Sequence, residues 1–135
     1  MLKISDFNIS GESIPQTVAD KIYLYHAIPL NVVREELIEI DVRVSQRSGY
    51  RPTWWEKQAG RDGTSEHCFR GNGAVDITCD DFSENKEQLV EALIKYTNYQ
   101  RIAVYNTFIH CDYKPNGDGK RWIFDSKWRR VKIAK

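Results

Sequence analysis

The feature that most restricts the fold of this chain is a change of hydrophobic periodicity along its 135 residues. Residues 83–99, SENKEQLVEALIKYTNY, place Leu89, Leu93 and Tyr96 on one face of a helix, and Ser83 is suited to cap it. The tail that follows is predicted to form strands. The strand segments are RIAVYN (101–106), TFIHCDY (107–113) and, after the turn KPNGDGK (114–120), KRWIFD (120–125), with KWRRVKI (127–133) as a last edge strand.

The first third of the chain repeats this order, with helical spacing before alternation. Apolar stripes formed by Val18, Ile22 and Tyr25, and after Pro29 by a second set, predict helices near the N-terminus. Short strands are expected at 40–46 and 72–78. We therefore expect a single α+β domain over residues 1–135, with N-terminal helices and one central helix packed on a small antiparallel sheet.

Composition excludes several classes of function. The net charge is +1, so no global field attracts nucleic acid or an anionic membrane, and the basic stretch KWRRVK is short. No apolar run approaches the roughly 20 residues of a membrane span, and the first residues lack the apolar core of a signal peptide. We expect a monomer made in the cytoplasm, with no nucleic acid or membrane partner. Three cysteines without CxxC spacing do not predict a disulfide framework.

Candidate catalytic residues lie within and after the irregular segment 47–73, which is long for a connection inside a compact domain. His26, on a predicted helix, is expected to be a packing residue. His67 and Asp76 flank the loop CFRGNG, and both residue types are good zinc ligands. A surface turn that happens to contain a histidine is the simpler interpretation of this pair taken alone.

A third ligand is expected from the strand FIHCDY. Alternation places Phe108, His110 and Asp112 on one face of that strand. If this face meets His67 and Asp76, the set leaves a fourth position open, as in catalytic zinc sites. Asp112 would then act on a bound water or orient His110.

Together, SGYRP, SEH…GNGAVDIT and FIHCDY resemble the zinc D-alanyl-D-alanine carboxypeptidases, a family with phage endolysins and the dipeptidases of vancomycin resistance. The resemblance covers about residues 45–113. It implies a zinc site at the sheet edge with His67, Asp76 and His110 as ligands. It also implies that Arg51 stabilises the tetrahedral intermediate, although an arginine at such a turn is also a common solvated residue. Ser65 matches the serine two residues before the first ligand.

Two positions depart from the pattern. The interval between His67 and Asp76 is two residues longer than the common form, so the loop must bulge. The family's usual acid, three residues before the last histidine, is Thr107 here. Asp112 is the expected replacement as general base. The remaining candidates are Glu56, Glu66, Asp80 and Asp81.

The expected function is zinc-dependent hydrolysis of peptidoglycan stem peptides, of the D,D-carboxypeptidase or L-Ala-D-Glu endopeptidase type. Tyr50 and Trp54 are candidates for contact with the substrate or for support of the site; Trp54 and Trp55 are equally suited to core packing. Without a signal peptide, a phage-type lysin or a virion component is expected to reach the wall. The alternative is a non-catalytic domain, stabilised by zinc, that binds the wall or serves in a virion.

Overall fold

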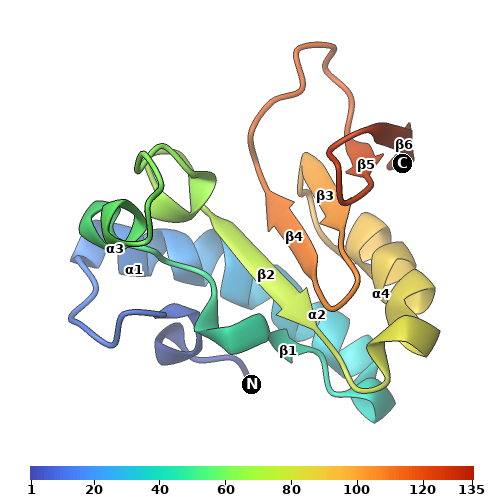
Figure 1. The fold of residues 1–135 in the computed structure, drawn as a ribbon. Helices are drawn as coiled ribbons and strands as arrows, with labels where there is room; N and C mark the ends of the chain where they lie inside the picture. Colours follow the sequence, from blue (N-terminus) through green and yellow to red (C-terminus); the bar gives the residue numbers. More distant parts are fainter.

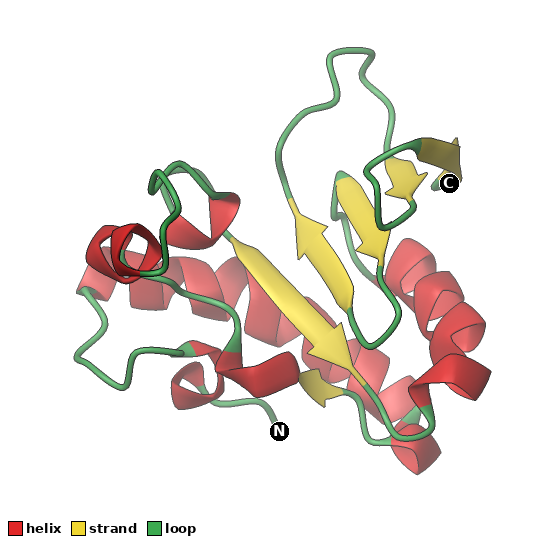
Figure 2. Ribbon diagram, in the orientation of Figure 1, coloured by secondary structure: helices red, strands yellow, loops and turns green.

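A six-stranded sheet forms the centre of the protein, as a computed structural model describing all residues 1–135 shows (Figures 1 and 2). The strand order is β1-β2-β4-β3-β5-β6. Neighbouring strands are antiparallel, except that β3 and β5 are parallel. The strands are β1 Arg43–Val44, β2 Ala74–Thr78, β3 Arg101–Val104, β4 Ile109–Asp112, β5 Trp122–Phe124 and β6 Arg130–Ile133.

The longer helices lie behind this sheet in the view of Figure 1. An N-terminal helical segment runs through α1 (Gln16–Lys21), a π-helical stretch η2 (Ile22–Ala27) and α2 (Ile28–Glu36). Helix α2 packs against α4 (Phe82–Tyr96). The short helices are η1 Ile4–Phe7, η3 Ile38–Ile40, η4 Ser45–Arg47, α3 Thr53–Gln58 and η5 Glu66–Cys68. The predicted α+β class is confirmed.

One face of the sheet is apolar and faces these helices. The fully buried side chains of Val75, Ile77, Ile109 and Cys111 come from alternate positions of β2 and β4, and they belong to the core with the helix residues Ile22, Leu30, Val33, Leu89 and Leu93. The same alternation turns Asp76, His110 and Asp112 to the opposite face. The predicted faces of the FIHCDY strand are confirmed.

The predicted first strand is shorter than expected. Only Arg43 and Val44 pair with β2, although Val42 is also buried. Asp41 and Gln46 on either side have left-handed backbones, with φ of 47° and 51°. This conformation ends strand pairing at both sides.

Pro29 does not separate two helices, as the sequence led us to expect, but lies near the start of α2 in the continuous segment. Proline has no N–H to donate to the carbonyl four residues earlier, that of Tyr25. The Tyr113 hydroxyl donates a hydrogen bond to the Tyr25 carbonyl. The π-helical stretch immediately before Pro29 is the local deviation expected at such a site.

Two further expectations need correction. The helix α4 begins at Phe82 after Asp81, so Ser83 lies in its first turn and does not cap it. The long segment before His67, expected to be irregular, contains the short helix α3.

The segment between β4 and β5 includes the turn sequence KPNGDGK (residues 114–120), but β4 and β5 are not neighbours in the sheet. The chain passes β3 and adds β5 parallel to it, on the side away from β4. Strand β6 then forms the far edge, and its four residues are exposed. No helix has the length and apolar character needed to cross a membrane. All three cysteines are free thiols.

Candidate metal centre

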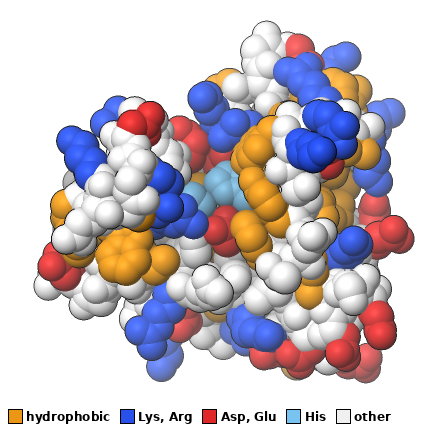
Figure 3. Space-filling view, viewed as in Figure 1, with side chains coloured by type: hydrophobic (Ala, Val, Ile, Leu, Met, Phe, Trp, Pro, Cys, Tyr) orange, Lys and Arg blue, Asp and Glu red, His pale blue; other side chains and the backbone are white.

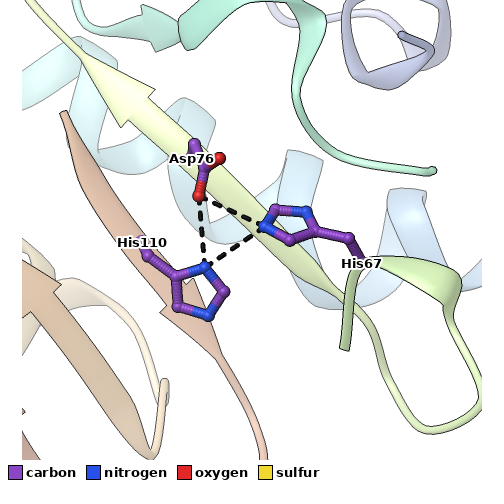
Figure 4. A group of neighbouring side chains, drawn as sticks. All are labelled: His67, Asp76 and His110. Atoms are coloured by element: carbon purple, nitrogen blue, oxygen red, sulfur yellow. Dashed lines mark hydrogen bonds and ion pairs between the residues drawn. The ribbon is translucent and has the colours of Figure 1, made fainter. Parts of the chain in front are cut away.

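Three side chains from separate segments converge on the polar face of the sheet (Figure 4). His67 Nε2 lies 3.3 Å from Asp76 Oδ1 and 3.2 Å from His110 Nδ1. His110 Nδ1 lies 3.2 Å from Asp76 Oδ1, which closes a triangle of possible ligand atoms. All three residues are buried.

Strand pairing brings two of these residues together. Asp76 on β2 is directly opposite His110 on β4 in the antiparallel register. Both strands are interior, with β1 outside β2 and β3 outside β4. The group therefore lies on the face of two interior strands, and not at the sheet edge as expected.

His67 comes from the short helix η5, and local hydrogen bonds set its orientation. The Ser65 hydroxyl accepts a hydrogen bond from the His67 amide and caps η5. His67 Nδ1 lies 2.8 Å from the Gly49 carbonyl oxygen, which can only accept, so Nδ1 carries the proton. The lone pair of Nε2 is consequently directed at the cluster, as is typical of a histidine ligand with an oriented second nitrogen.

The loop between His67 and Asp76 is held down from two sides. Lys21 Nζ donates to the Gly71 carbonyl (2.7 Å), and His26 Nε2 contacts the Asn72 carbonyl (2.7 Å). Phe69 is buried beneath Gly73, where an added Cβ would lie 2.2 Å from the Phe69 ring. The predicted bulge is therefore a packed structure. His26 is the buried, hydrogen-bonded packing residue that its sequence position predicts.

The donor set fits a metal ion. A tetrahedral ion with bonds of ~2.0–2.1 Å holds its ligand atoms ~3.3 Å apart. The three observed separations are 3.2, 3.2 and 3.3 Å. Two imidazole nitrogens and a carboxylate oxygen are a familiar combination for such ions. The buried group of His67, Asp76 and His110 can hold a metal ion.

Asp112 contacts the far side of His110. Its Oδ2 lies 2.7 Å from His110 Nε2, whereas the cluster faces Nδ1. Arg101 binds both carboxylate oxygens, and the Lys114 amide donates to Oδ1. Asp112 is thus positioned to orient His110, one of the two roles expected for it. It does not face the open side of the cluster, where the other role, that of general base, would place it.

Asp76 is also held by residues outside the triangle. Its Oδ2 accepts hydrogen bonds from the Ser48 hydroxyl (2.8 Å) and from Arg51 Nη2 (3.0 Å), so Oδ1 is left for the histidines. Arg51 Nη2 also donates to Ser48 Oγ, and its Nη1 lies 3.8 Å from Glu56 Oε1. Arg51 is therefore not a solvated turn residue. We did not single out Ser48 from the sequence, although it begins the block SGYRP.

These contacts shift the pKa values of the cluster. Burial alone would raise the pKa of Asp76 and Asp112, but hydrogen bonds outweigh it. Bonds from His110 and His67 hold the pKa of Asp76 well below its usual range, and those from His110 and Arg101 lower the pKa of Asp112 to about 2. Burial lowers the pKa of His67. For His110, burial is outweighed by hydrogen bonds to Asp112 and Asp76, and the pKa rises. Two carboxylates stay ionised beside the histidines.

The cluster opens into a surface hollow (Figure 3). The pale blue histidine atoms lie at its floor, with hydrophobic side chains on one flank and basic ones on the other. Its lining residues are Arg51, Ser65, His67, Asp76, Tyr105, Phe108, His110 and Trp128. Tyr105, Phe108 and Trp128 form an aromatic flank that we did not predict as part of the site, because Tyr105 and Trp128 lie outside every recognisable motif.

Tyr50 and Trp54 do not line this hollow. Tyr50 packs edge-on against Phe69, with ring centroids 5.9 Å apart, and so supports the loop. Trp54 is 43% exposed on α3 beside Trp55. A wall of the hollow formed by Trp54 is therefore not observed.

None of the remaining acidic candidates, Glu56, Glu66, Asp80 and Asp81, is among the lining residues of the hollow. Glu56 is buried and paired with Arg61. Asp80 pairs with Arg43, and Asp81 begins α4. Thr107, three residues before His110, lies in the β3–β4 turn, where its carbonyl accepts a hydrogen bond from the Thr78 hydroxyl. Asp76 is the one carboxylate residue among the lining residues.

Comparisons with protein-family models, with curated proteins and with solved structures find no match to this chain. The protein is an α+β domain with a buried His–Asp–His group, able to hold a metal ion, at the floor of a surface hollow.

Proposed function

We propose that this protein is a zinc-dependent peptidase that hydrolyses stem peptides of bacterial peptidoglycan. The observation that carries the proposal is the triangle of ligand atoms, spaced for a tetrahedral ion and facing a hollow that a substrate can enter. The motif blocks around Arg51, His67 and His110 support the substrate class through their resemblance to the zinc carboxypeptidases and endolysins.

Zinc is the proposed ion because the ligands are two imidazole nitrogens and one carboxylate oxygen, with a fourth position open. When bound, zinc supplies Lewis acidity, which polarises a substrate carbonyl and makes a coordinated water nucleophilic near neutral pH. Calcium and magnesium prefer sites built from oxygen atoms, so they fit this donor set less well.

The protein's own residues hold the ligands and shape the charge of the site. Arg101 binds Asp112, which fixes the His110 ring through Nε2, and the Gly49 carbonyl fixes His67 in the same way. Arg51 lines the hollow while one of its nitrogens is anchored on Asp76. A cation at this position favours an oxygen on which negative charge develops.

A second candidate function follows from the acidic residues. Asp76 Oδ2 already accepts two hydrogen bonds, and no other carboxylate lines the hollow to take a proton from water. This observation favours a non-catalytic domain that uses the metal for stability and binds wall peptides without cleaving them. Under the leading proposal, solvent in the open hollow would accept the proton that the attacking water loses. Both candidate functions place the protein at the bacterial cell wall, which it would reach after release from the cell or as part of a virion.

The test combines metal analysis with digestion of purified peptidoglycan. We expect about one zinc per chain and release of peptide fragments, with mass spectrometry identifying the cleaved bond. His67→Ala should lose both the metal and the cleavage. Glu36→Ala, a change at an exposed position at the end of α2, is the control and should keep both.

Each result decides between the candidates. A protein that binds no zinc, or a His67→Ala variant that cleaves as well as the original chain, contradicts the peptidase proposal. Zinc binding together with retention on peptidoglycan, but with no fragment released, supports the non-catalytic domain.

A further inference from the structure

The aromatic flank of the hollow has no part in holding the ligands, yet it is rigidly built. Tyr105 and Phe108 flank the two-residue turn between β3 and β4, and the Tyr105 amide donates to the Phe108 carbonyl (2.9 Å). Their rings stack with centroids 4.6 Å apart and an interplanar angle of 11°. The Tyr105 ring is therefore held in one orientation at the edge of the hollow.

A contact with Trp128 determines what the Tyr105 hydroxyl can do. Trp128 Nε1 lies 2.7 Å from Tyr105 Oη. The indole N–H can only donate, so the Tyr105 oxygen is the acceptor and its own proton must point elsewhere. No group of the chain accepts a hydrogen bond from this hydroxyl. Tyr105 thus brings a donor without a protein partner to the lining of the hollow.

Trp128 is held in place at a conformational cost. Its φ is 59°, a value that bulky residues rarely adopt and that is associated with functional sites. Asp125 stabilises the turn: its carbonyl accepts from the Trp128 amide, and its carboxylate accepts from Lys127 and Arg129. The turn places the indole 5.2 Å from the His110 ring and 4.5 Å from the Arg101 guanidinium. The indole therefore links Tyr105 to the residues that support the cluster.

We infer that the Tyr105 hydroxyl is a further catalytic group, which donates a hydrogen bond to the oxygen that gains negative charge in the hollow, and that Trp128 is its positioning residue. The inference rests on the proposed function. The hydroxyl only donates a hydrogen bond, so no covalent bond to it forms or breaks. A neutral donor aimed beforehand at a developing oxyanion stabilises the transition state more than the ground state.

The experiment uses the zinc-loaded full chain and two readouts. The first is the Kd of inorganic phosphate, a tetrahedral oxyanion, measured by calorimetry beside imidazole, a neutral metal ligand. Tyr105→Phe keeps the ring stack and removes the donor. It should weaken phosphate about 10- to 100-fold and leave imidazole unchanged, as expected for a hydrogen bond to a charged group. Tyr23→Phe, at an exposed tyrosine on the N-terminal helix, is the control.

The second readout is turnover of wall peptide, in which Tyr105→Phe should lower kcat about 10- to 100-fold with KM little changed. Trp128→Phe keeps an aromatic ring but removes the N–H, and should weaken phosphate in the same direction by a smaller factor. This variant decides the question if Tyr105→Phe does not fold or loses zinc.

The two proposals fail in different ways. Phosphate that does not bind the original chain, or binds Tyr105→Phe and Trp128→Phe as tightly as the original, overturns the inference whatever the peptidase assay gives. A chain that cleaves nothing but loses phosphate affinity in Tyr105→Phe supports the donor and contradicts the proposed peptidase.

Discussion

At the scale of single residues, each of the three side chains that can hold a metal ion is oriented by a partner outside the cluster. His67 has the Gly49 carbonyl, Asp76 has Ser48 and Arg51, and His110 has Asp112. Because a neutral imidazole has one donor and one acceptor nitrogen, the partner on one nitrogen decides which nitrogen is left for a metal. The partners therefore determine which atom each of the three side chains presents to a metal ion.

Replacing Asp112 by asparagine tests this dependence. Asp112→Asn removes the charge that binds His110 and Arg101, so the ring is held less firmly and is a poorer ligand. Metal affinity should fall about 10- to 100-fold, measured by competition with a chromophoric chelator. Asp20→Asn, on the exposed side of α1, should have no effect. Equal affinities in all three proteins would show that Asp112 does not support the ligand.

His26 gives a prediction for acid stability. It is fully buried, its Nε2 contacts the Asn72 carbonyl and its Nδ1 contacts the Tyr99 hydroxyl. Since the carbonyl can only accept, Nε2 is the donor and the ring is neutral with both nitrogens bonded. Burial, opposed in part by the Asn72 bond, lowers the pKa of His26 from 6.5 to about 4.

The lowered pKa of His26 determines how the stability of the folded chain changes with pH. Above pH 6.5 the ring is neutral in both states, but between pH 6.5 and about 4 the unfolded chain binds a proton that the folded chain does not. Stability should fall by on the order of 2–3 kcal/mol from pH 7 to pH 4.5 through this group. His26→Gln should be less stable at pH 7 and show a shallower decline in urea unfolding. If the stability of the variant and of the original chain fell equally between pH 7 and pH 4.5, His26 would not be the group responsible.

At the scale of elements, two connections do most to build the site. The register of β2 and β4 places Asp76 opposite His110, and the loop from η5 to β2 returns His67 to them. That loop turns at Gly73, whose φ is +84° and whose Cα faces the Phe69 ring. A side chain at this position would strain the backbone and displace Phe69.

Gly73→Ala should therefore lower the free energy of unfolding by more than backbone strain alone would. Gly117 has nearly the same φ, +85°, and open space around it, which makes Gly117→Ala the matched control. The control should cost about 1–2 kcal/mol from the left-handed conformation alone. Gly73→Ala should cost about 2 kcal/mol more because of the overpacked ring, and should weaken metal binding. Equal losses in chemical unfolding would contradict the packing explanation.

At the scale of the whole molecule, the cluster joins three segments that are distant in the sequence. His67 precedes β2, Asp76 lies within β2 and His110 lies on β4 beyond the helix α4. A ligand that binds only the folded arrangement stabilises it by mass action. Metal binding should therefore report on the folding of the entire domain.

Zinc at about 100 times its Kd should raise the unfolding free energy by about 2.7 kcal/mol, visible as an increase of several degrees in Tm by calorimetry. Magnesium should give no shift, because the cluster offers two nitrogen ligands. His110→Ala should abolish the response to zinc. A Tm that rises equally for His110→Ala would mean that zinc binds elsewhere.

The sequence alone was sufficient for the fold class and for the residues that meet at the cluster. Periodicity identified α4, β2 and the faces of β4, because hydrophobic burial acts on residues close in sequence. The spacing of His67, Asp76 and His110, together with the resemblance, was enough to select these three. Local patterns also placed His26 among packing residues.

The orientation of the side chains around the cluster, and the aromatic flank of the hollow, depend on the tertiary structure. Alternation places Asp112 on the face of His110, but only packing shows that it binds Nε2 and Arg101 and turns away from the hollow. The crossover that puts β5 beside β3 brings Trp128 to His110 and Tyr105, residues that no motif connects. Residue type and spacing determine which groups are available. The direction in which each group points depends on contacts between segments far apart in the chain, and these exist only once the sheet has assembled.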